Sequence, residues 1–239
     1  MISFIIPTLN EERVLEHVLR NLATYSGECE IIVSDGRSSD RTIAIAKEHG
    51  ARVVVYEGTA RQTIANGRNL GAAAAQGEYL VFVDADVLFY NPDEFFARAL
   101  GFFAADPNLV ALTVRLKVVS DVETTPDRII FACLNYFHWF LNNALKVGVS
   151  AGEFQMMRAA ALKKIGGYNE KLVASEDYDC FARLGKIGRT RYEHSLIAYH
   201  LGRRAHRIGW PRLLFQWFGN SVSFWIFNRS MSKEWKEIR

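Results

Sequence analysis

The chain has 239 residues, 49% of them hydrophobic and 23% charged, and this length fits one large α/β domain or two small ones. The formal net charge of +3 is too small to favour nucleic acid as a partner. Its cysteines, Cys29, Cys133 and Cys180, show neither metal-ligand spacing nor a disulfide framework, which is typical of a reducing cytosol.

Strands and helices alternate along the first part of the chain. Apolar, β-branched runs predict strands at residues 2–6, 30–34, 52–56 and 80–83. Helices are expected between them, starting near Asn10, starting near Asp40 and spanning residues 62–75. Asn10 and Asp40 are suitable N-caps, because their side chains accept hydrogen bonds from the first helical turn. This alternation predicts βαβ units and an α/β fold with a mostly parallel, Rossmann-like sheet flanked by helices.

Two carboxylates, Asp84 and Asp86, end the fourth of these strands. In an open α/β sheet, ligands bind beyond the carboxyl ends of the strands. Two neighbouring carboxylates repel each other unless a cation shares them, and oxygen ligands suit Mg²⁺ or Mn²⁺. Aspartates are also common in turns, so an Asp-x-Asp triplet alone leaves both interpretations open.

The later elements are less regularly spaced. Ser175 is a good N-cap for a helix that has Glu176 and Asp177 in its first turn. The remaining predicted elements are a helix at 92–104, a strand at 109–118, a strand at 152–158 and a short helix at 159–165.

A long amphipathic helix is predicted between residues 127 and 146. Its broad apolar stripe includes five aromatic residues, and Asn135, His138 and Asn142 lie on a narrow polar side. One interpretation is a core helix that packs on the sheet. The other is that the aromatic residues form part of a membrane-facing surface and guide a lipid-linked acceptor.

Six segments together resemble glycosyltransferase family 2, and they occur in the family's order. They are IIPTLNEE (5–12), DGRSSDRT (35–42), GRNLG (67–71), DAD (84–86), GGY (166–168) and SED (175–177). The resemblance covers roughly residues 2 to 200. It implies the GT-A nucleotide-diphospho-sugar transferase fold and a metal-dependent, inverting glycosyltransferase that moves a sugar from a nucleotide-diphospho-sugar to a hydroxyl or phosphate acceptor.

The resemblance also implies roles for the matching residues. Asp177, with Glu176 beside it, would be the catalytic base. Asp86 and Asp84 would hold Mg²⁺ or Mn²⁺, with His200 as a further ligand. The donor would be bound by Pro7, Asn10, Glu12 near the ribose, Asp35 at the base, Arg68 at the diphosphate or base, and Asp84. Many family members have two adjacent aspartates where this chain has Asp35-Gly36, so the base stays unassigned.

Two other functions remain as alternatives. A nucleotidyltransferase would need a Gly-rich, basic loop after the first strand, where this chain has Pro7 to Glu12. An inactive nucleotide-sugar-binding scaffold would not need Asp84, Asp86 and Asp177. The sugar stays unassigned, and the acceptor is expected to be a polyprenyl phosphate, a lipid-linked sugar or a cell-envelope polysaccharide intermediate.

Residues 203–239 are predicted to form a basic, aromatic helical extension of a catalytic domain at residues 1–202. Arginines precede an apolar run at 213–227, which is too short to span a bilayer, and Arg229, Lys233 and Lys236 follow it. Aromatic and basic residues favour the headgroup region of an anionic membrane. Because Met1 leads directly into a strand without a signal peptide, we expect a cytoplasmic protein, peripheral at the inner face of the cytoplasmic membrane. The alternative is a helix packed on the domain or at a homo-oligomer interface, with Arg203 and Arg204 holding the donor diphosphate.

Overall fold

The computed structural model describes residues 1–227 and 229–232. Its strands are β1 (Ile2–Thr8), β2 (Cys29–Asp35), β3 (Arg52–Val55), β4 (Tyr79–Val83), β5 (Leu109–Val118), β6 (Phe154–Arg158) and β7 (Arg189–His200). Its helices are α1 (Leu15–Leu22), α2 (Thr42–Glu48), α3 (Ile64–Ala74), α4 (Pro92–Ala105), α5 (Thr125–Trp139), α6 (Ala159–Lys164), α7 (Glu176–Gly185), α8 (Arg203–Ile208) and α9 (Trp210–Phe227). A π-helical turn, Phe140–Ala144, follows α5.

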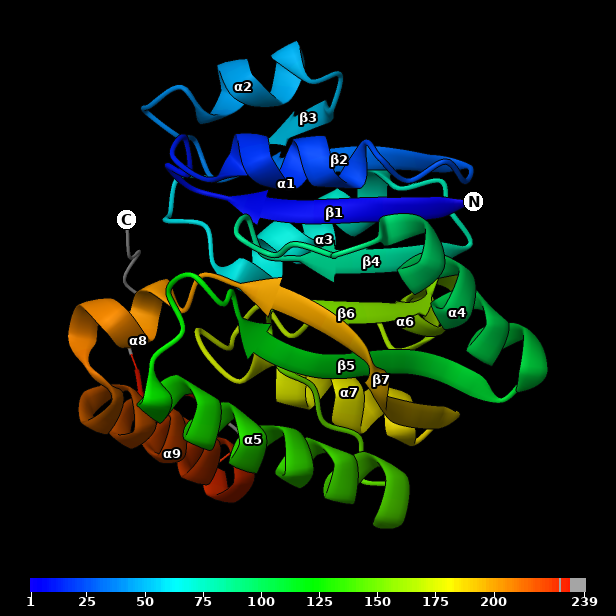
Figure 1. Ribbon diagram of the computed structural model, residues 1–239, viewed down its shortest axis with the longest axis vertical. Helices are drawn as coiled ribbons and strands as arrows, with labels where there is room; N and C mark the ends of the chain where they lie inside the picture. Colours follow the sequence, from blue (N-terminus) through cyan, green and yellow to red (C-terminus); the bar gives the residue numbers. More distant parts are fainter. Residues whose placement is uncertain (228, 233–239) are drawn as a thin grey trace.

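Within these residues the strands form one sheet in the order β3-β2-β1-β4-β6-β5-β7, with helices on both faces (Figure 1). Only β6 runs against its neighbours, β4 and β5, and the other paired strands are parallel. The predicted mostly parallel α/β sheet is therefore confirmed. The chain proceeds outward from β1 to β3 and then returns to the other side of β1 as β4. Such a reversal is where open α/β sheets bind ligands.

Strand β1 is buried on both faces, which explains its unbroken apolar sequence. Phe4 and Ile6 belong to a core with α1, α2 and α4, whereas Ile5 packs in a second core with α3, α6 and α7. Phe4, Ile5 and Ile6 are fully buried. Burial on both sides fixes the register of β1, because a shift by one residue would exchange the two sets of side chains.

Three expected helix caps differ from the structure. Asn10 lies at a left-handed φ of 58° and α1 begins only at Leu15, so Asn10 caps no helix. Asp40 precedes α2 by two residues, and Arg41 takes the N-cap position. Ser175 does occupy the N-cap position of α7, but at a φ of 67° and without a side-chain cap. In each case the helix begins without the expected side-chain cap.

The long helix after residue 124, α5, buries its polar side and exposes most of its apolar side, which is the reverse of the expected core helix. Its polar residues Asn135, His138 and Asn142 are buried, and most of its aromatic residues are exposed. Asn135 accepts a hydrogen bond from the Leu116 backbone N–H at 3.0 Å and donates to the Leu116 carbonyl at 2.9 Å. The amide side chain thus pairs with β5 as another strand would. The expectation that the apolar stripe packs on the sheet is wrong for this helix.

The segment after residue 202 packs on the sheet domain. Ala205, Trp210 and Leu213 of α8 and α9 are buried in the same core as β1. Residue 228 and residues 233–239, which include the predicted basic positions Lys233 and Lys236, lie outside the described residues. Among the described helices, none is long and apolar enough to cross a bilayer.

Gly71 of α3 allows the helix to approach β1. A Cβ at this position would lie 2.3 Å from Cγ2 of the buried Ile5. We expect Gly71→Ala to lower the free energy of unfolding by about 1–3 kcal/mol, because neither the strand nor the helix can move without disturbing the core. Urea unfolding measures this change.

Gly101 provides the matched control for that substitution. It lies inside α4, and a Cβ there would meet nothing within 4 Å. Gly101→Ala should leave the stability unchanged or raise it by up to about 1 kcal/mol. Equal destabilisation by both substitutions would contradict the close approach of α3 and β1.

Candidate active site

The carboxyl ends of β1, β2 and β4 bring three predicted segments to one edge of the sheet. Loops after β1 and β2 carry Asn10, Glu12 and Asp35, and the loop after β4 carries Asp84 and Asp86. The parallel pairing of β1 with both other strands is what places these loops next to one another.

Asp35 is fully buried and braces the loop that follows β2. One of its oxygens accepts hydrogen bonds from the Thr8 hydroxyl at 2.9 Å and from the Ser38 hydroxyl at 2.6 Å. The other accepts from the Ser38 backbone N–H at 2.7 Å. Both oxygens are therefore engaged within the protein, and contact with a nucleotide base stays a prediction.

The loops after β1 and β2 are tied together by side chains expected to bind the donor. Asn10 accepts a hydrogen bond from the Ser39 N–H at 2.8 Å. Glu12 is exposed and accepts from the Arg41 N–H at 3.0 Å. Pro7 lies beneath Gly67 of α3, where a Cβ would approach its ring at 3.2 Å. These contacts hold the backbone in shape, and donor contacts by Pro7, Asn10 and Glu12 stay predictions.

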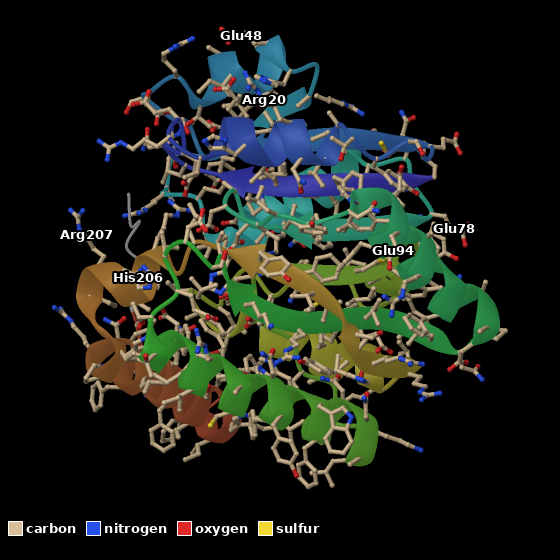
Figure 2. The ribbon with its side chains drawn as sticks, in the orientation of Figure 1. Arg20, Glu48, Glu78, Glu94, His206 and Arg207 are labelled. Carbon is tan, nitrogen blue, oxygen red and sulfur yellow. The ribbon has the colours of Figure 1, made fainter. Side chains whose placement is uncertain are left out.

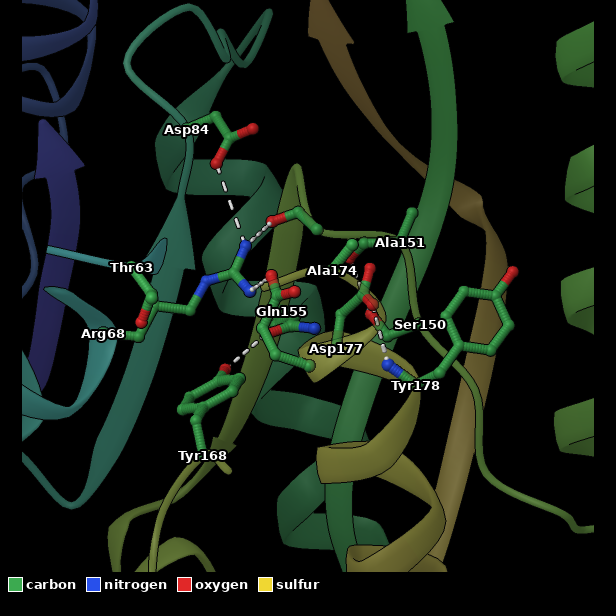
Figure 3. A network of polar contacts seen from close by, with 12 residues as sticks. Thr63, Arg68, Asp84, Ser150, Ala151, Gln155, Tyr168, Ala174, Asp177 and Tyr178 are labelled. Carbon is green, nitrogen blue, oxygen red and sulfur yellow. Dashed lines mark hydrogen bonds and ion pairs between the residues drawn. The ribbon is translucent and has the colours of Figure 1, made fainter. Parts of the chain in front are cut away.

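Arg68 lies at the centre of the candidate site and joins its two halves (Figure 3). Its guanidinium donates to Glu176 at 2.8 Å and to the Gly152 carbonyl at 2.8 Å. One of its nitrogens lies 3.9 Å from a carboxylate oxygen of Asp84. Because only 2% of Arg68 is exposed, the structure gives it the position of an internal link between the end of β4 and the start of α7.

Asp84 lies beside charges of both signs. Its backbone N–H donates to the Glu153 carbonyl at 3.2 Å. Loss of hydration raises the pKa of Asp84, although 41% of its side chain stays exposed; Arg68 opposes this shift, and the negative charges of Glu153 and Asp86 add to it. Burial also lowers the pKa of Arg204, while Asp84 and Glu153 oppose that shift. Arg204, predicted to contact the donor, is thus placed on this side of the site.

Asp86 is held by an arginine from the C-terminal part of the chain. The Arg203 Nε–H donates to Asp86 at 2.8 Å, and another Arg203 nitrogen donates to Glu11 at 2.8 Å. Burial raises the pKa of Glu11, and the nearby Asp86 adds to the shift, whereas Arg203 lowers it. The guanidinium therefore supplies the positive charge that two neighbouring carboxylates require.

His200 ends β7 with one ring nitrogen unsatisfied. Its Nδ1 accepts from the Gly202 N–H at 3.2 Å, and its ring packs edge-on against Phe131. Its buried Nε2 has no hydrogen-bond partner among the described residues. Buried polar atoms are rarely left this way. Because Nδ1 accepts, Nε2 carries the ring proton, so it could ligate a metal only in the other tautomer, without the Gly202 contact.

The residues predicted to bind metal suit a divalent ion in chemistry but are not gathered around one point. Among residues 1–227 and 229–232, no three His, Cys, Asp or Glu side chains form a metal-binding arrangement. Arg203 engages one carboxylate oxygen of Asp86, so a cation would compete with the guanidinium for that oxygen. The metal role of Asp84, Asp86 and His200 therefore stays a prediction.

Asp177 opens α7 on the other side of Arg68. One carboxylate oxygen accepts from the Tyr178 backbone N–H at 2.8 Å, and a Cβ on Gly152 would lie 3.5 Å from the other oxygen. Burial and the charge of Glu176 raise the pKa of Asp177 well above its usual value, and Arg68 opposes the shift. A carboxylate with a raised pKa is a stronger proton acceptor once it is ionised.

Two acidic residues of this region, Glu153 and Glu11, were missed from the sequence, and so was the contact of Arg203 with Asp86. Glu153 precedes β6 and raises the pKa values of Asp84, Asp177 and Tyr178. Glu11, rather than Glu12, points to Asp86 through Arg203. The adjacent acidic residues at 11 and 12 are apparent in the sequence, but hydrophobic periodicity does not predict which of the two side chains points inward. The sequence singles out Arg203 only as a candidate contact to the donor diphosphate, not to Asp86, and Glu153 carries no distinguishing signal.

Comparison with known proteins agrees with this geometry. The model of "Glycosyl transferase family 2" matches residues 3–166. The 4,4'-diaponeurosporenoate glycosyltransferase of Staphylococcus haemolyticus (strain JCSC1435) is 42% identical over 94 residues, which cover 38% of this chain and 25% of that protein. The chain therefore spans about a quarter of the length of this curated relative.

Solved structures share the fold at low sequence identity. The S. aureus TarS 1–349 structure has a TM-score of 0.67 and 22% identity, covering 86% of this chain and 61% of that one. The mannosyltransferase PcManGT from Pyrobaculum calidifontis, in complex with GDP-Man and Mn²⁺, has a TM-score of 0.68 and 21% identity, covering 92% and 64%. The sheet and its flanking helices thus form the GT-A fold.

The raised pKa of Asp177 predicts how this residue affects stability. Asp177 is partly buried, and an ionised carboxylate in this position destabilises the fold, so its contribution worsens as the pH rises from 3.8, its unfolded value, toward the folded pKa. Asp177→Asn keeps an oxygen to accept from the Tyr178 N–H but cannot ionise. We expect it to raise the free energy of unfolding, by more at pH 8 than at pH 5, in urea titrations. If the difference in the free energy of unfolding between this variant and the wild type does not grow with pH, the raised pKa of Asp177 is contradicted.

Proposed function

Because the chain belongs to glycosyltransferase family 2, we propose that it transfers a sugar from a nucleotide-diphospho-sugar to an acceptor with inversion at the anomeric carbon. The observation that carries this proposal is the link through Arg68, whose guanidinium contacts Glu176 at 2.8 Å and lies 3.9 Å from Asp84. A base at the start of α7 and the carboxylates after β4 then belong to one site. The reaction needs both, because the leaving diphosphate and the acceptor lie on opposite sides of the sugar.

The donor is proposed to bind over the carboxyl ends of β1, β2 and β4. The family places Pro7, Asn10, Glu12 and Asp35 around the nucleoside. In this chain those residues shape the two loops that would enclose it. Arg204 would lie near the diphosphate, since its charge interacts with that of Asp84. Arg68 is proposed to act through Asp84 and Glu176 rather than by reaching the donor itself.

A divalent cation, Mg²⁺ or Mn²⁺, is proposed to bind with the donor. Asp84 and Asp86 would hold it, and His200 would join them only if Nδ1 gives up the Gly202 N–H and Nε2 loses its proton. When bound, such a cation stabilises the charge that grows on the leaving diphosphate. Without it, Arg203 neutralises Asp86 and Glu11, so metal binding would exchange one positive charge for another.

Asp177 is proposed to be the general base. It would take the proton from the acceptor hydroxyl as the new bond forms between that oxygen and the anomeric carbon. The bond from the anomeric carbon to the diphosphate breaks at the same time, and the nucleoside diphosphate leaves. A single attack from the side opposite the leaving group inverts the anomeric carbon. The raised pKa of Asp177 supports this role.

The product of donor turnover separates this proposal from its main alternative. A glycosyltransferase releases nucleoside diphosphate, whereas a nucleotidyltransferase acting on a triphosphate releases pyrophosphate. A panel of nucleotide sugars with Mn²⁺ or Mg²⁺, with and without a membrane lipid extract as the acceptor source, tests the reaction. Pyrophosphate as the product would overturn the proposal.

Asp86→Asn tests the metal site. We expect it to abolish turnover and to weaken Mn²⁺ binding in the presence of nucleoside diphosphate, because the cation loses a charged ligand. Electron paramagnetic resonance of free Mn²⁺ measures that binding without turnover. Asp121→Asn, a change at an exposed aspartate outside the site, is the control and should behave as the wild type. Full activity in excess chelator would exclude the metal.

Asp177→Asn tests the base. Donor affinity should hardly change, whereas transfer should fall by roughly two to four orders of magnitude, because an amide cannot accept the proton. Donor affinity is measured by calorimetry and transfer by nucleoside diphosphate release with acceptor. Lost donor affinity in this variant would instead assign Asp177 to structure or to metal binding.

A further inference from the structure

Helix α5 turns aromatic side chains outward where a core helix would bury them. The exposed fractions of Tyr136 and Phe137 are 66% and 46%. The polar residues between them, Asn135 and His138, are 8% and 5% exposed. Exposing large apolar side chains to water is unfavourable, so this helix is arranged for an apolar environment outside the domain.

Helix α9 repeats the same arrangement. It buries Trp210, Leu213, Asn220 and Phe224 against the domain. Its outward side carries further large apolar residues, with Phe215 and Phe218 at 70% and 72% exposed. In Figure 2, ring-bearing side chains extend from both helices on the side away from the sheet.

The two helices contact each other near their starts. The Trp210 indole N–H donates to Asp127 of α5 at 2.8 Å, and the Trp210 ring packs on Phe131 at 5.5 Å between centroids. We call the exposed apolar side chains of these helices and of the turn after α5 the aromatic face; its members are Ile129, Tyr136, Phe137, Trp139, Phe140, Leu145, Leu214, Phe215, Phe218, Val222, Trp225, Ile226 and Phe227. Large exposed apolar side chains gathered on neighbouring helices indicate an interaction site.

Positive charge predominates along the segments of the aromatic face, because Asp127 at the start of α5 is buried and Glu123 pairs with Arg128. Residues 128–152 and 194–233 contain no aspartate or glutamate. Exposed Lys146, Arg207 and Arg212 lie on or next to the two helices, and Figure 2 shows Arg207 extending into solvent. A second copy of the chain would bring the same positive charges to the contact. An anionic lipid surface supplies both the apolar region and the opposite charge.

The aromatic face borders the proposed catalytic base. His138 of α5 lies 3.0 Å from the Tyr178 hydroxyl, one residue after Asp177. Ser230, just beyond α9, accepts from the backbone N–H groups of Val173 and Ala174 at 3.0 Å. Both helices are therefore attached to the segment that carries Asp177.

We propose that the aromatic face binds an anionic lipid bilayer and lies in its headgroup region without crossing it. The described helices are too short or too polar to span a bilayer, and amphipathic helices with outward aromatic residues lie at this depth. Binding would place the start of α7 next to the membrane. That an acceptor carried by a lipid then reaches Asp177 rests on the proposed function, whereas the binding itself does not.

Co-sedimentation of the full chain with vesicles tests the binding, without donor or acceptor. Vesicles of phosphatidylcholine with phosphatidylglycerol are compared with phosphatidylcholine alone, at low and high salt. The chain should bind the anionic vesicles at least tenfold more tightly, and salt should weaken the binding. Phe215→Ser with Phe218→Ser should reduce it at least tenfold. Tyr90→Ser is the matched control, since Tyr90 is 96% exposed but precedes α4.

Two further variants separate the contributions. Lys146→Glu with Arg212→Glu should weaken binding to anionic vesicles and leave the weak binding to neutral ones unchanged. Asp177→Asn should bind vesicles as the wild type does even if transfer is lost, so failure of the proposed function and failure of this inference are distinguishable. Circular dichroism checks that each variant is folded.

Three outcomes would overturn the inference. The wild type does not sediment with anionic vesicles; the double serine variant binds as well as the wild type; or the chain dimerises in light scattering and the double serine variant abolishes the dimer without vesicle binding by either form. The last result would assign the aromatic face to a second copy of the chain.

Discussion

The buried ion pair between Arg68 and Glu176 is the interaction on which the site depends. Taking both charges out of water is costly, and removing only one partner leaves an uncompensated charge inside the protein. The pair therefore holds α3 against α7, although the two helices lie more than a hundred residues apart in sequence. Through the further contacts of Arg68 with Gly152 and Asp84, it also fixes the segment before β6 against the end of β4. The proposed donor and acceptor sides thus share a single rigid connection.

The sequence predicted the part of this architecture that rests on local patterns. Apolar runs located β1 to β6, and the carboxylates after β4 lie where a strand end would put them. It could not predict what depends on distant partners. The orientation of α5 depends on Asn135, whose side chain hydrogen-bonds the backbone N–H and carbonyl of Leu116 in β5. This contact places the polar side of the helix against the sheet. Strand β7 was not delimited because a register shift against β5, around His194 to Leu196, breaks its alternation. The contact of Arg203 with Asp86, 117 residues away, leaves no trace in spacing or composition.

Positive charge in the C-terminal part is divided between two environments. Arg203 and Arg204 lie inward, among Glu11, Asp84, Asp86 and Glu153. Arg207 and Arg212 lie outward, beside the exposed aromatic residues of α9. The alternatives weighed for this segment, donor binding and membrane binding, therefore need not compete for the same arginines. Helix α8 carries arginines of both groups, so a shift of this helix would move both the inward and the outward positive charges.

The ionisation of Asp177 has a consequence for how the protein can evolve. A group whose charge is unfavourable in the native state makes its own loss a stabilising event. Selection for heat resistance alone, applied above neutral pH, would enrich replacements at this position and so remove the base proposed here. Retention of Asp177 would then depend on selection for the proposed catalytic role, against its unfavourable effect on stability. Stabilising substitutions should therefore be made at positions such as Gly101. A side chain there has open space around it and does not involve the proposed catalytic residues.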